Sequence, residues 1–134
     1  MAGILDCWGG MTDARQDLGK SGENLAATAL ESRGYAIVAR RYRTEHGEID
    51  IIARDGETMV FVEVRRKSSD EFGTAAESVT PAKQRRVIRM AIEYLALHGL
   101  YDRCDVRFDV VAIDDLPDGT PQLAVYQSAF DASR

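Results

Sequence analysis

GEIDIIARDGETMVFVEVRRK, residues 47–67, holds two apolar runs on either side of an Asp-Gly pair. Asp-Gly between alternating hydrophobic runs is the strongest short-range signal for a β-hairpin. Three carboxylates, Glu48, Asp50 and Glu63, fall inside these runs. Burying an unpaired acid on a strand costs free energy, so the hairpin must either neutralise these carboxylates or use them.

The Asp-Gly pair also predicts a register for the hairpin. If this pair forms the turn, Glu48 lies opposite Glu63, and Asp50 lies opposite Phe61. Side chains alternate along a strand, so one face then carries five charged groups, Glu48, Asp50, Glu63, Arg65 and Lys67. Opposed acids repel each other, and a bound Mg²⁺ would remove the repulsion because it takes carboxylate oxygens as ligands. Ion pairs with the arginine and lysine of the same face are the alternative.

Length and composition favour one folded domain. The chain has 134 residues, and 45% of them are hydrophobic, which is enough for a core. Its two cysteines lack metal-ligand spacing and suit the reducing cytoplasm, where we expect the protein. We expect neither a signal peptide nor a membrane span, because the N-terminal residues have no basic start and no long apolar run. We interpret residues 1–16 as a flexible N-terminal extension and residues 17–134 as a single domain.

The charge is unevenly distributed along the chain. The net charge of −5 argues at first against a nucleic-acid partner. Residues 33–89, however, hold twelve basic and nine acidic groups, whereas residues 90–134 hold three basic and eight acidic groups. A metal ion that neutralised the hairpin acids would leave the middle of the chain strongly positive. A solvated surface of mixed charge is the alternative.

Two segments outside the hairpin predict helices. Residues 21–34, SGENLAATALESRG, begin with a capping residue, Ser21, and end at Gly34. Residues 80–99, TPAKQRRVIRMAIEYLALHG, begin with the capping residue Thr80 and have proline in the first turn. An apolar stripe at helical spacing in this second segment is formed by Val87, Ala91, Tyr94 and Leu95.

Three further segments predict strands. They have strand composition and cover residues 35–42, 106–114 and 122–127, and a polar loop is expected at residues 68–78. The expected order is therefore helix, three strands, helix and two strands. The predicted fold class is α/β, a mixed central sheet of about five strands flanked by α-helices.

The spacing of the hairpin acids resembles a known pattern. An acid, followed thirteen residues later by Glu-x-Lys at the end of a hairpin strand, is the core motif of the PD-(D/E)XK nuclease superfamily. Asp50 and the triplet Glu63-Val64-Arg65 occupy these places. From Gly19 onward the chain resembles the YraN-like family of predicted endonucleases, which is related to archaeal Holliday-junction resolvases. The matching segments are GENLAATALESRGYAIVARRYRTEHGEIDIIARDG, MVFVEVR, FGTAAESVTPAKQRRV, AIEYL and VRFDVVAI.

The resemblance implies a restriction-endonuclease-like core and a metal-dependent endonuclease that acts on branched or damaged DNA. It implies Mg²⁺, or Mn²⁺, bound by the carboxylates of Glu23, Glu48, Asp50 and Glu63. The implied catalytic residues are Asp50, Glu63, Arg65 and Lys67, and the implied partners are DNA and a second copy of the chain as a homodimer. The alternative for Glu23 is an ordinary exposed helix glutamate.

Basic residues flank the predicted site on both sides. Backbone phosphates need positive and hydrogen-bonding groups but no base readout, so we expect recognition of DNA structure without recognition of sequence. The candidate nucleic-acid-binding residues are Arg40, Arg41, Arg43, Lys83, Gln84, Arg85, Arg86 and Arg89. For those of the second helix, a solvated helix face is the alternative.

One position departs from the family pattern. The family usually has lysine where this chain has Arg65, and arginine where it has Lys67. Lysine at this place positions or activates the attacking water, whereas arginine does not readily give up its proton. Lys67 follows two residues later on the same face and is the candidate substitute. Two function classes stay open, a DNA endonuclease and a nuclease-fold module that binds nucleic acid or a protein without hydrolysis.

Overall fold

The computed structural model describes residues 14–68 and 79–131, and the order of its elements confirms the predicted order. The elements are α2 (Ala14–Ser32), β1 (Ala36–Thr44), β2 (Gly47–Asp55), β3 (Thr58–Ser68), α3 (Pro81–Leu97), β4 (Val106–Asp115) and β5 (Pro121–Phe130). Of the predicted extension at residues 1–16, only the last three residues are described, and they belong to α2. The predicted loop at 68–78 lies outside the described residues except for Ser68, the last residue of β3.

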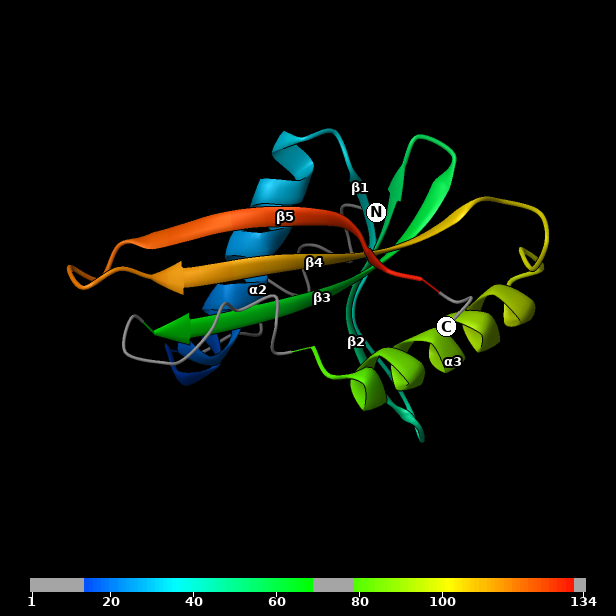
Figure 1. Ribbon diagram of the computed structural model, residues 1–134, viewed down its shortest axis with the longest axis horizontal. Coiled ribbons are helices and arrows are strands. Elements are labelled where there is room, and N and C mark those ends of the chain that lie inside the picture. Colours follow the sequence, from blue (N-terminus) through cyan, green and yellow to red (C-terminus); the bar gives the residue numbers. More distant parts are fainter. Residues whose placement is uncertain (1–13, 69–78, 132–134) are drawn as a thin grey trace.

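The five strands form one mixed sheet in the order β1-β2-β3-β4-β5 (Figure 1). Strands β3 and β4 are parallel, and the other neighbours are antiparallel. A parallel pair needs a crossover connection, and α3 lies in that connection. A five-stranded mixed sheet flanked by two helices confirms the predicted fold class and fits a restriction-endonuclease-like core.

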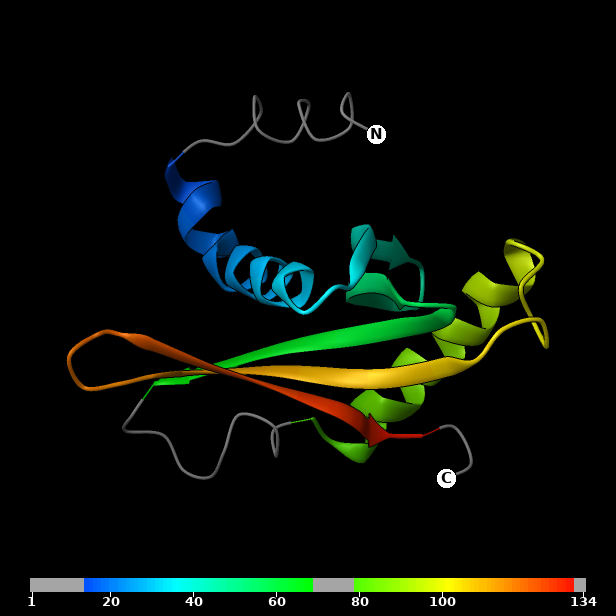
Figure 2. The ribbon, with the colours of Figure 1, turned by 90° about the horizontal axis from the view of Figure 1, so that it is seen from above.

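Each helix covers one face of the sheet. Figure 2 shows α2 on one side of the strands and α3 on the other. On the α2 side, Ala26 and Leu30 pack in one buried cluster with Ile51, Val62 and Val111. On the α3 side, the predicted stripe is buried against the other face, together with Met90 and Phe61. The two-sided burial explains why the hairpin strands are almost continuously apolar.

The two helices differ in how well their starts were predicted. Thr80 caps α3 as predicted, because its side chain accepts a hydrogen bond from the N–H of Lys83. Ser21 is not the cap of the first helix, because α2 already begins at Ala14. The segment ARQDLGK before Ser21 is rich in helix formers, and these outweigh the glycine within it. A serine therefore marked a plausible start but not the actual one.

The predicted register of the hairpin is wrong by two residues, because the turn lies one residue further along the chain than predicted. Ile52, and not Asp50, pairs with Phe61, and Asp55 pairs with Thr58. The two turn residues are therefore Gly56 and Glu57. Gly56 has φ +65°, and a positive φ at the first central position is what a tight hairpin turn of this kind requires of glycine. Glu48 does not lie opposite Glu63; it pairs with Arg43 on β1.

Gly47, at the start of β2, is required by its backbone and by its neighbour. Its φ is +140°, and a Cβ at this position would lie 2.9 Å from Cδ of Arg86 on α3. We expect Gly47→Ala to lower the free energy of unfolding by about 1–3 kcal/mol, because alanine is strained at positive φ. Urea denaturation measures this, with Gly56→Asn as the control because asparagine tolerates φ +65° and meets open space there. Equal stability of the two variants would contradict the close packing at Gly47.

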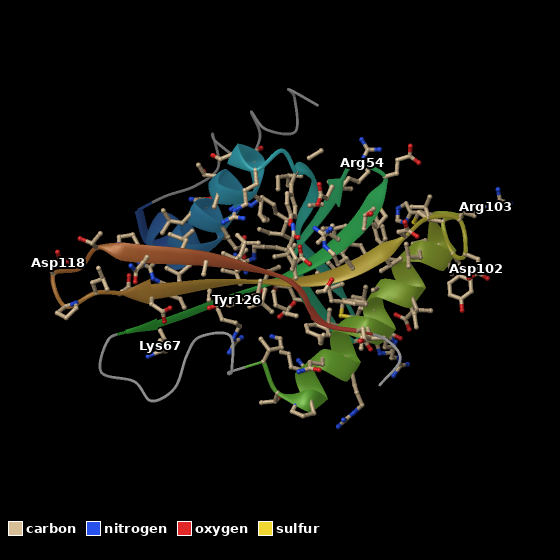
Figure 3. All side chains as sticks on the ribbon, turned by 45° about the horizontal axis from the view of Figure 1, so that its top comes forward. Arg54, Lys67, Asp102, Arg103, Asp118 and Tyr126 are labelled. Atoms are coloured by element: carbon tan, nitrogen blue, oxygen red, sulfur yellow. The ribbon has the colours of Figure 1, made fainter. Side chains whose placement is uncertain are left out.

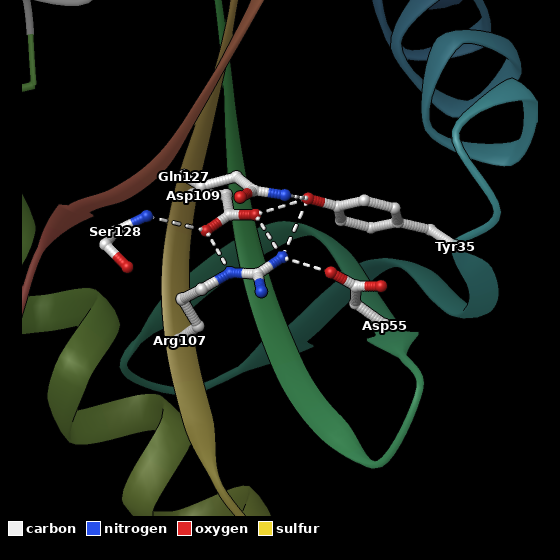
Figure 4. A network of polar contacts seen from close by, with 6 residues as sticks. All are labelled: Tyr35, Asp55, Arg107, Asp109, Gln127 and Ser128. Carbon is white, nitrogen blue, oxygen red and sulfur yellow. Dashed lines mark hydrogen bonds and ion pairs between the residues drawn. The ribbon is translucent and has the colours of Figure 1, made fainter.

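A polar network around a buried acid joins β2, β4 and β5 (Figure 4). Asp109 is fully buried and accepts hydrogen bonds from Arg107 Nε and Nη2, both at 3.0 Å. Tyr35 Oη donates to the same carboxylate at 2.8 Å, and the backbone N–H of Ser128 donates at 3.0 Å. Arg107 also contacts Asp55 at 2.9 Å. The network satisfies its one buried acid and links β2, β4 and β5 to Tyr35, which lies between α2 and β1.

Candidate metal and nucleic-acid site

The candidate site lies where the ladder between β2 and β3 ends. The last paired residues are Ile51 and Val62. Asp50 then accepts a hydrogen bond from the backbone N–H of Val64 through Oδ2, at 2.8 Å. Beyond this point, within the described residues, β2 pairs only with β1, and β3 pairs only with β4. The carboxylate of Asp50 thus takes the place of a backbone carbonyl as the acceptor for the N–H of Val64. Because Glu63 precedes Val64, this bond holds Asp50 next to Glu63.

Glu63 is a fully buried acid, with 0% of its surface exposed. Among the described residues, neither of its carboxylate oxygens accepts a well-directed hydrogen bond. Lys83 Nζ forms an ion pair with Oε1 at 3.2 Å. Burial, together with the neighbouring charge of Asp50, raises the pKa of Glu63 to about 7, and Lys83 opposes the shift. An acid buried in this way is costly unless a further cation joins it.

Asp50 also belongs to a group of three acids. Ligand oxygens of Glu23, Glu48 and Asp50 all lie within 4.8 Å of one another. Glu23 comes from α2, and the other two come from β2. Burial also raises the pKa values of Asp50 and Glu23, and the N–H of Val64 opposes the shift at Asp50. Asp50 is therefore the acid that links this group of three to Glu63.

A local kink brings this group together. Along β2, Ile51 and Ala53 pack on the α2 side, whereas Ile49 and Ile52 both pack on the α3 side. Alternation is therefore interrupted at Asp50. On the neighbouring strand, Arg41 has φ +55°, a left-handed conformation that is unusual for arginine. The regular alternation assumed from the sequence does not hold at the site, although the acids still converge.

Arginines of β1 pair with two of the acids. Glu23 lies 3.6 Å from Arg40 and 3.7 Å from Arg41. Glu48 lies 3.6 Å from Arg41 and 2.7 Å from Arg43. Ion pairs, the alternative to a metal ion, are thus present at Glu23 and Glu48. Among the described residues, their partners are arginines of β1, and not Arg65 or Lys67. Oε1 of Glu23 is nevertheless buried without a hydrogen bond within the described part of the chain.

The two basic residues after Glu63 differ in their distance from it. The positive charge of Arg65, two residues along β3, lowers the pKa values of both Asp50 and Glu63. Lys67 lies four residues beyond Glu63, which is roughly 13 Å along a strand. Figure 3 places Lys67 near the far end of β3. The structure therefore brings Arg65, but not Lys67, close to the buried acids.

The first turns of α3 present the remaining predicted residues. Gln84 donates from Nε2 to the carbonyl of Val79 at 3.0 Å, so it holds the start of the helix. Arg85, Arg86 and Arg89 are exposed. The Cδ atom of Arg86 approaches Gly47, so this basic helix face lies beside the turn between β1 and β2. The predicted basic residues of β1 and α3 thus both lie near the start of β2, which carries Glu48 and Asp50.

Comparison with known proteins gives the family. The model of the uncharacterised protein family UPF0102 matches residues 22–113. The chain belongs to UPF0102. This UPF0102 chain is 46% identical over 123 residues to a UPF0102 protein of Anaeromyxobacter dehalogenans, covering 92% of this chain and 90% of that protein. It is also 46% identical over 115 residues to a UPF0102 protein of Symbiobacterium thermophilum, covering 86% and 97% of the two chains.

A third UPF0102 relative, from Chlorobium chlorochromatii, is 49% identical over 98 residues, with 73% of this chain and 74% of that protein covered. These matches confirm the predicted YraN-like family. In the described parts of this UPF0102 chain, no helix is both long and apolar enough to cross a membrane. The region matched by the family model includes the four candidate metal ligands, Glu23, Glu48, Asp50 and Glu63. It also includes the basic residues of β1 and of α3.

Sequence reasoning assigned Lys83 of the UPF0102 chain to DNA binding and did not connect it with Glu63. The two residues are twenty positions apart and lie on different elements. A lysine in the first turn of a helix carries no local signal for a contact with a distant strand. Only the packing of α3 on the sheet reveals the ion pair.

The exposed basic face of α3 in the UPF0102 chain leads to a binding prediction. We expect Arg85→Ala with Arg86→Ala to weaken DNA binding about equally across sequences, because phosphate contacts carry no sequence information. The slope of log affinity against log salt should fall by roughly one unit per lost contact. Titrations at several salt concentrations measure the slope, with Arg54→Ala plus Arg103→Ala as the control of equal charge. An unchanged slope would place the DNA on another surface.

Proposed function

We propose that this UPF0102 protein is a metal-dependent endonuclease of the PD-(D/E)XK type that hydrolyses phosphodiesters in branched or damaged DNA. The observation that carries the proposal is Glu63, a fully buried acid without a well-directed hydrogen bond in the described residues, next to Asp50. We propose the cytoplasm as its location, and DNA and a second copy of the chain as its partners.

The residues present fit Mg²⁺ or Mn²⁺. Both ions prefer oxygen ligands, and the site offers carboxylate oxygens from three elements. Asp50 and Glu63 are the proposed principal ligands, since burial raises the pKa of each and no arginine pairs closely with either in the ion pairs of the described residues. Glu48 and Glu23 lie close enough to Asp50 to complete the site. When bound, the ion polarises the scissile phosphate and acidifies a water molecule.

The side chains of the protein have separate roles in this proposal. Val64 N–H holds the carboxylate of Asp50 in place. Arg65, which lies close to the buried acids, offsets negative charge on the phosphate. In the reaction, the oxygen of water bonds to phosphorus and the bond from phosphorus to the departing sugar oxygen breaks. The water proton passes to solvent, and the departing oxygen takes a proton from solvent.

The arginines that pair with Glu23 and Glu48 support a DNA partner. Arg43 exposes 65% of its side chain and Arg41 exposes 34%. Guanidinium groups of this kind form bidentate contacts with phosphate. The exposed arginines of α3 extend the same basic surface. Recognition of backbone shape follows from this arrangement, because phosphate contacts do not distinguish bases.

The alternative function is binding of nucleic acid or protein without hydrolysis. Arginine at position 65 favours this alternative, because a guanidinium does not accept a proton at neutral pH. Single-turnover assays separate the two, using a mobile four-way junction, a single-stranded flap and a linear duplex with Mg²⁺ and with Mn²⁺. We expect weak cleavage with Mg²⁺, faster cleavage with Mn²⁺ and none in Asp50→Asn, with Glu57→Gln at the hairpin turn as the control.

Two outcomes decide between the functions. Cleavage by the parent and by Glu57→Gln, but not by Asp50→Asn, supports the endonuclease. A parent protein that binds these DNAs and remains inert at high protein and Mn²⁺ concentrations supports the binding module.

A further inference from the structure

We infer that Lys83, reaching the site from α3, is the lysine that contacts the scissile phosphate and the attacking water, in place of a lysine on strand β3. The inference rests on the proposed endonuclease function and adds a catalytic residue to it. It also moves Lys83 from a general role in DNA binding to a role at the reacting atoms.

The geometry around Lys83 supports this assignment. Its Nζ atom lies 3.2 Å from Oε1 of Glu63, while 28% of its side chain remains exposed. The side chain thus reaches from a buried acid to the surface of the protein. A phosphate that approached Glu63 from solvent would meet the ammonium of Lys83. An ammonium carries three N–H groups, so the ion pair with Oε1 of Glu63 at 3.2 Å leaves others to donate to water or phosphate.

The start of α3 holds Lys83 in this position. Thr80 Oγ1 accepts a hydrogen bond from the backbone N–H of Lys83 at 3.2 Å. Pro81 occupies the first turn and fixes its backbone angle. Gln84 ties the same turn to the carbonyl of Val79 at 3.0 Å. These contacts order the backbone from which the lysine side chain extends.

The other cations near the site are less suited to this role. Lys83 lowers the pKa values of Asp50 and Glu63 more than Arg65 does. Lys67 lies roughly 13 Å along the strand from Glu63. Lysine offers a compact, rotatable ammonium on a flexible stem, whereas the guanidinium of Arg65 is planar and rigid. A lysine from α3 thus makes up for the arginine at position 65.

Lys83 neither gains nor loses a proton in the reaction. Its ammonium donates hydrogen bonds to the attacking water and to a non-bridging phosphate oxygen, and it keeps its own proton. As the new bond from oxygen to phosphorus forms and the bond to the sugar oxygen breaks, negative charge grows on the non-bridging oxygens. A fixed donor at this place stabilises that charge, and removing one such donor typically costs about 100-fold to 1,000-fold in rate.

The test compares Lys83→Gln with Arg65→Gln, and Arg54→Gln on β2 is the control of equal charge change. Single-turnover cleavage of the four-way junction is measured with saturating DNA and Mn²⁺. We expect Lys83→Gln to lose at least about 100-fold in rate, Arg65→Gln to lose less than about tenfold, and Arg54→Gln to match the parent. Saturating DNA separates this loss from a loss of binding.

A second readout does not depend on activity. Calorimetric titration with Mn²⁺ alone should show at least about threefold tighter binding by Lys83→Gln, because a positive charge next to a ligand is removed. A lysine that only supported the fold would instead weaken Mn²⁺ binding when replaced. If Lys83→Gln does not fold, Lys83→Arg provides the same comparison, with an expected rate between those of parent and Lys83→Gln.

The outcomes distinguish the inference from the proposed function. A parent that cleaves, with Lys83→Gln within about threefold of its rate and Arg65→Gln inactive, overturns the role of Lys83 and keeps the endonuclease. Weaker or unchanged Mn²⁺ binding by Lys83→Gln also counts against the inference. A parent that cleaves no DNA under any condition overturns the endonuclease and the role of Lys83 together.

Discussion

Glu63→Gln is expected to stabilise the metal-free protein at pH 8 and to remove its stabilisation by Mg²⁺. Burial and, after it, the neighbouring charge of Asp50 raise the pKa of Glu63 from the ordinary 4.5 to about 7. A raised pKa means that the protonated acid is the form compatible with folding. Its contribution is therefore fully present below pH 4.5 and is lost as the pH rises through about 7. Glutamine is neutral at every pH and avoids this loss.

The size of the stability difference between the parent and Glu63→Gln follows from the raised pKa of Glu63. One pKa unit corresponds to about 1.4 kcal/mol, so the loss by pH 8 is at most about 3 kcal/mol. Urea denaturation with a chelator at pH 5, 6.5 and 8 measures it. We expect the parent to fall below Glu63→Gln by about 1–3 kcal/mol at pH 8 and to match it near pH 5, with Glu57→Gln following the parent. Parallel curves for parent and Glu63→Gln would show that Glu63 is not charged and buried as described.

Arg107→Met is expected to lower the free energy of unfolding by about 3–5 kcal/mol, because removing one partner of a buried ion pair leaves the other charge uncompensated. Asp109 is fully buried and receives two hydrogen bonds from Arg107. Methionine keeps much of the volume but none of the charge. Urea denaturation at pH 7 measures the loss, and Arg54→Met at an exposed position of β2 is the control.

A double variant sharpens this second test. Asp109→Asn added to Arg107→Met removes the uncompensated charge, so it should restore part of the lost stability, and the two changes should not be additive. A loss below about 1 kcal/mol for Arg107→Met, or full additivity, would mean that the network of Figure 4 contributes little to the fold.

Much of the fold was predictable because its signals are local. The Asp-Gly hairpin, the capped helix at Thr80 and the apolar stripe through Tyr94 each depend on neighbours in the sequence. The register failed because Asp-Gly permits two placements of the turn, and the chain uses Gly56 as its first residue. Ser21 failed as a cap because helix formers precede it, and propensity extends a helix past a permitted start.

The candidate site was only partly predictable because its contacts are long-range. The resemblance to the nuclease family implied a metal site of Glu23, Glu48, Asp50 and Glu63, and the structure brings ligand oxygens of the first three within 4.8 Å of one another. The sequence did not reveal the interrupted alternation at Asp50 or the left-handed conformation of Arg41. It also did not reveal that arginines of β1 pair with Glu23 and Glu48. The ion pair between Lys83 and Glu63 depends on how α3 packs on the sheet, and no spacing in the sequence encodes that contact.

Titration of the metal-free protein with Mn²⁺ tests the central claim, that Asp50 and Glu63 bind a divalent metal. The account predicts saturable binding by the parent and by Glu57→Gln. It predicts at least about 100-fold weaker binding by Asp50→Asn and by Glu63→Gln, because Mn²⁺ depends on negatively charged oxygen ligands. Binding by Asp50→Asn as tight as that of Glu57→Gln, or no saturable binding by the parent, would contradict the account.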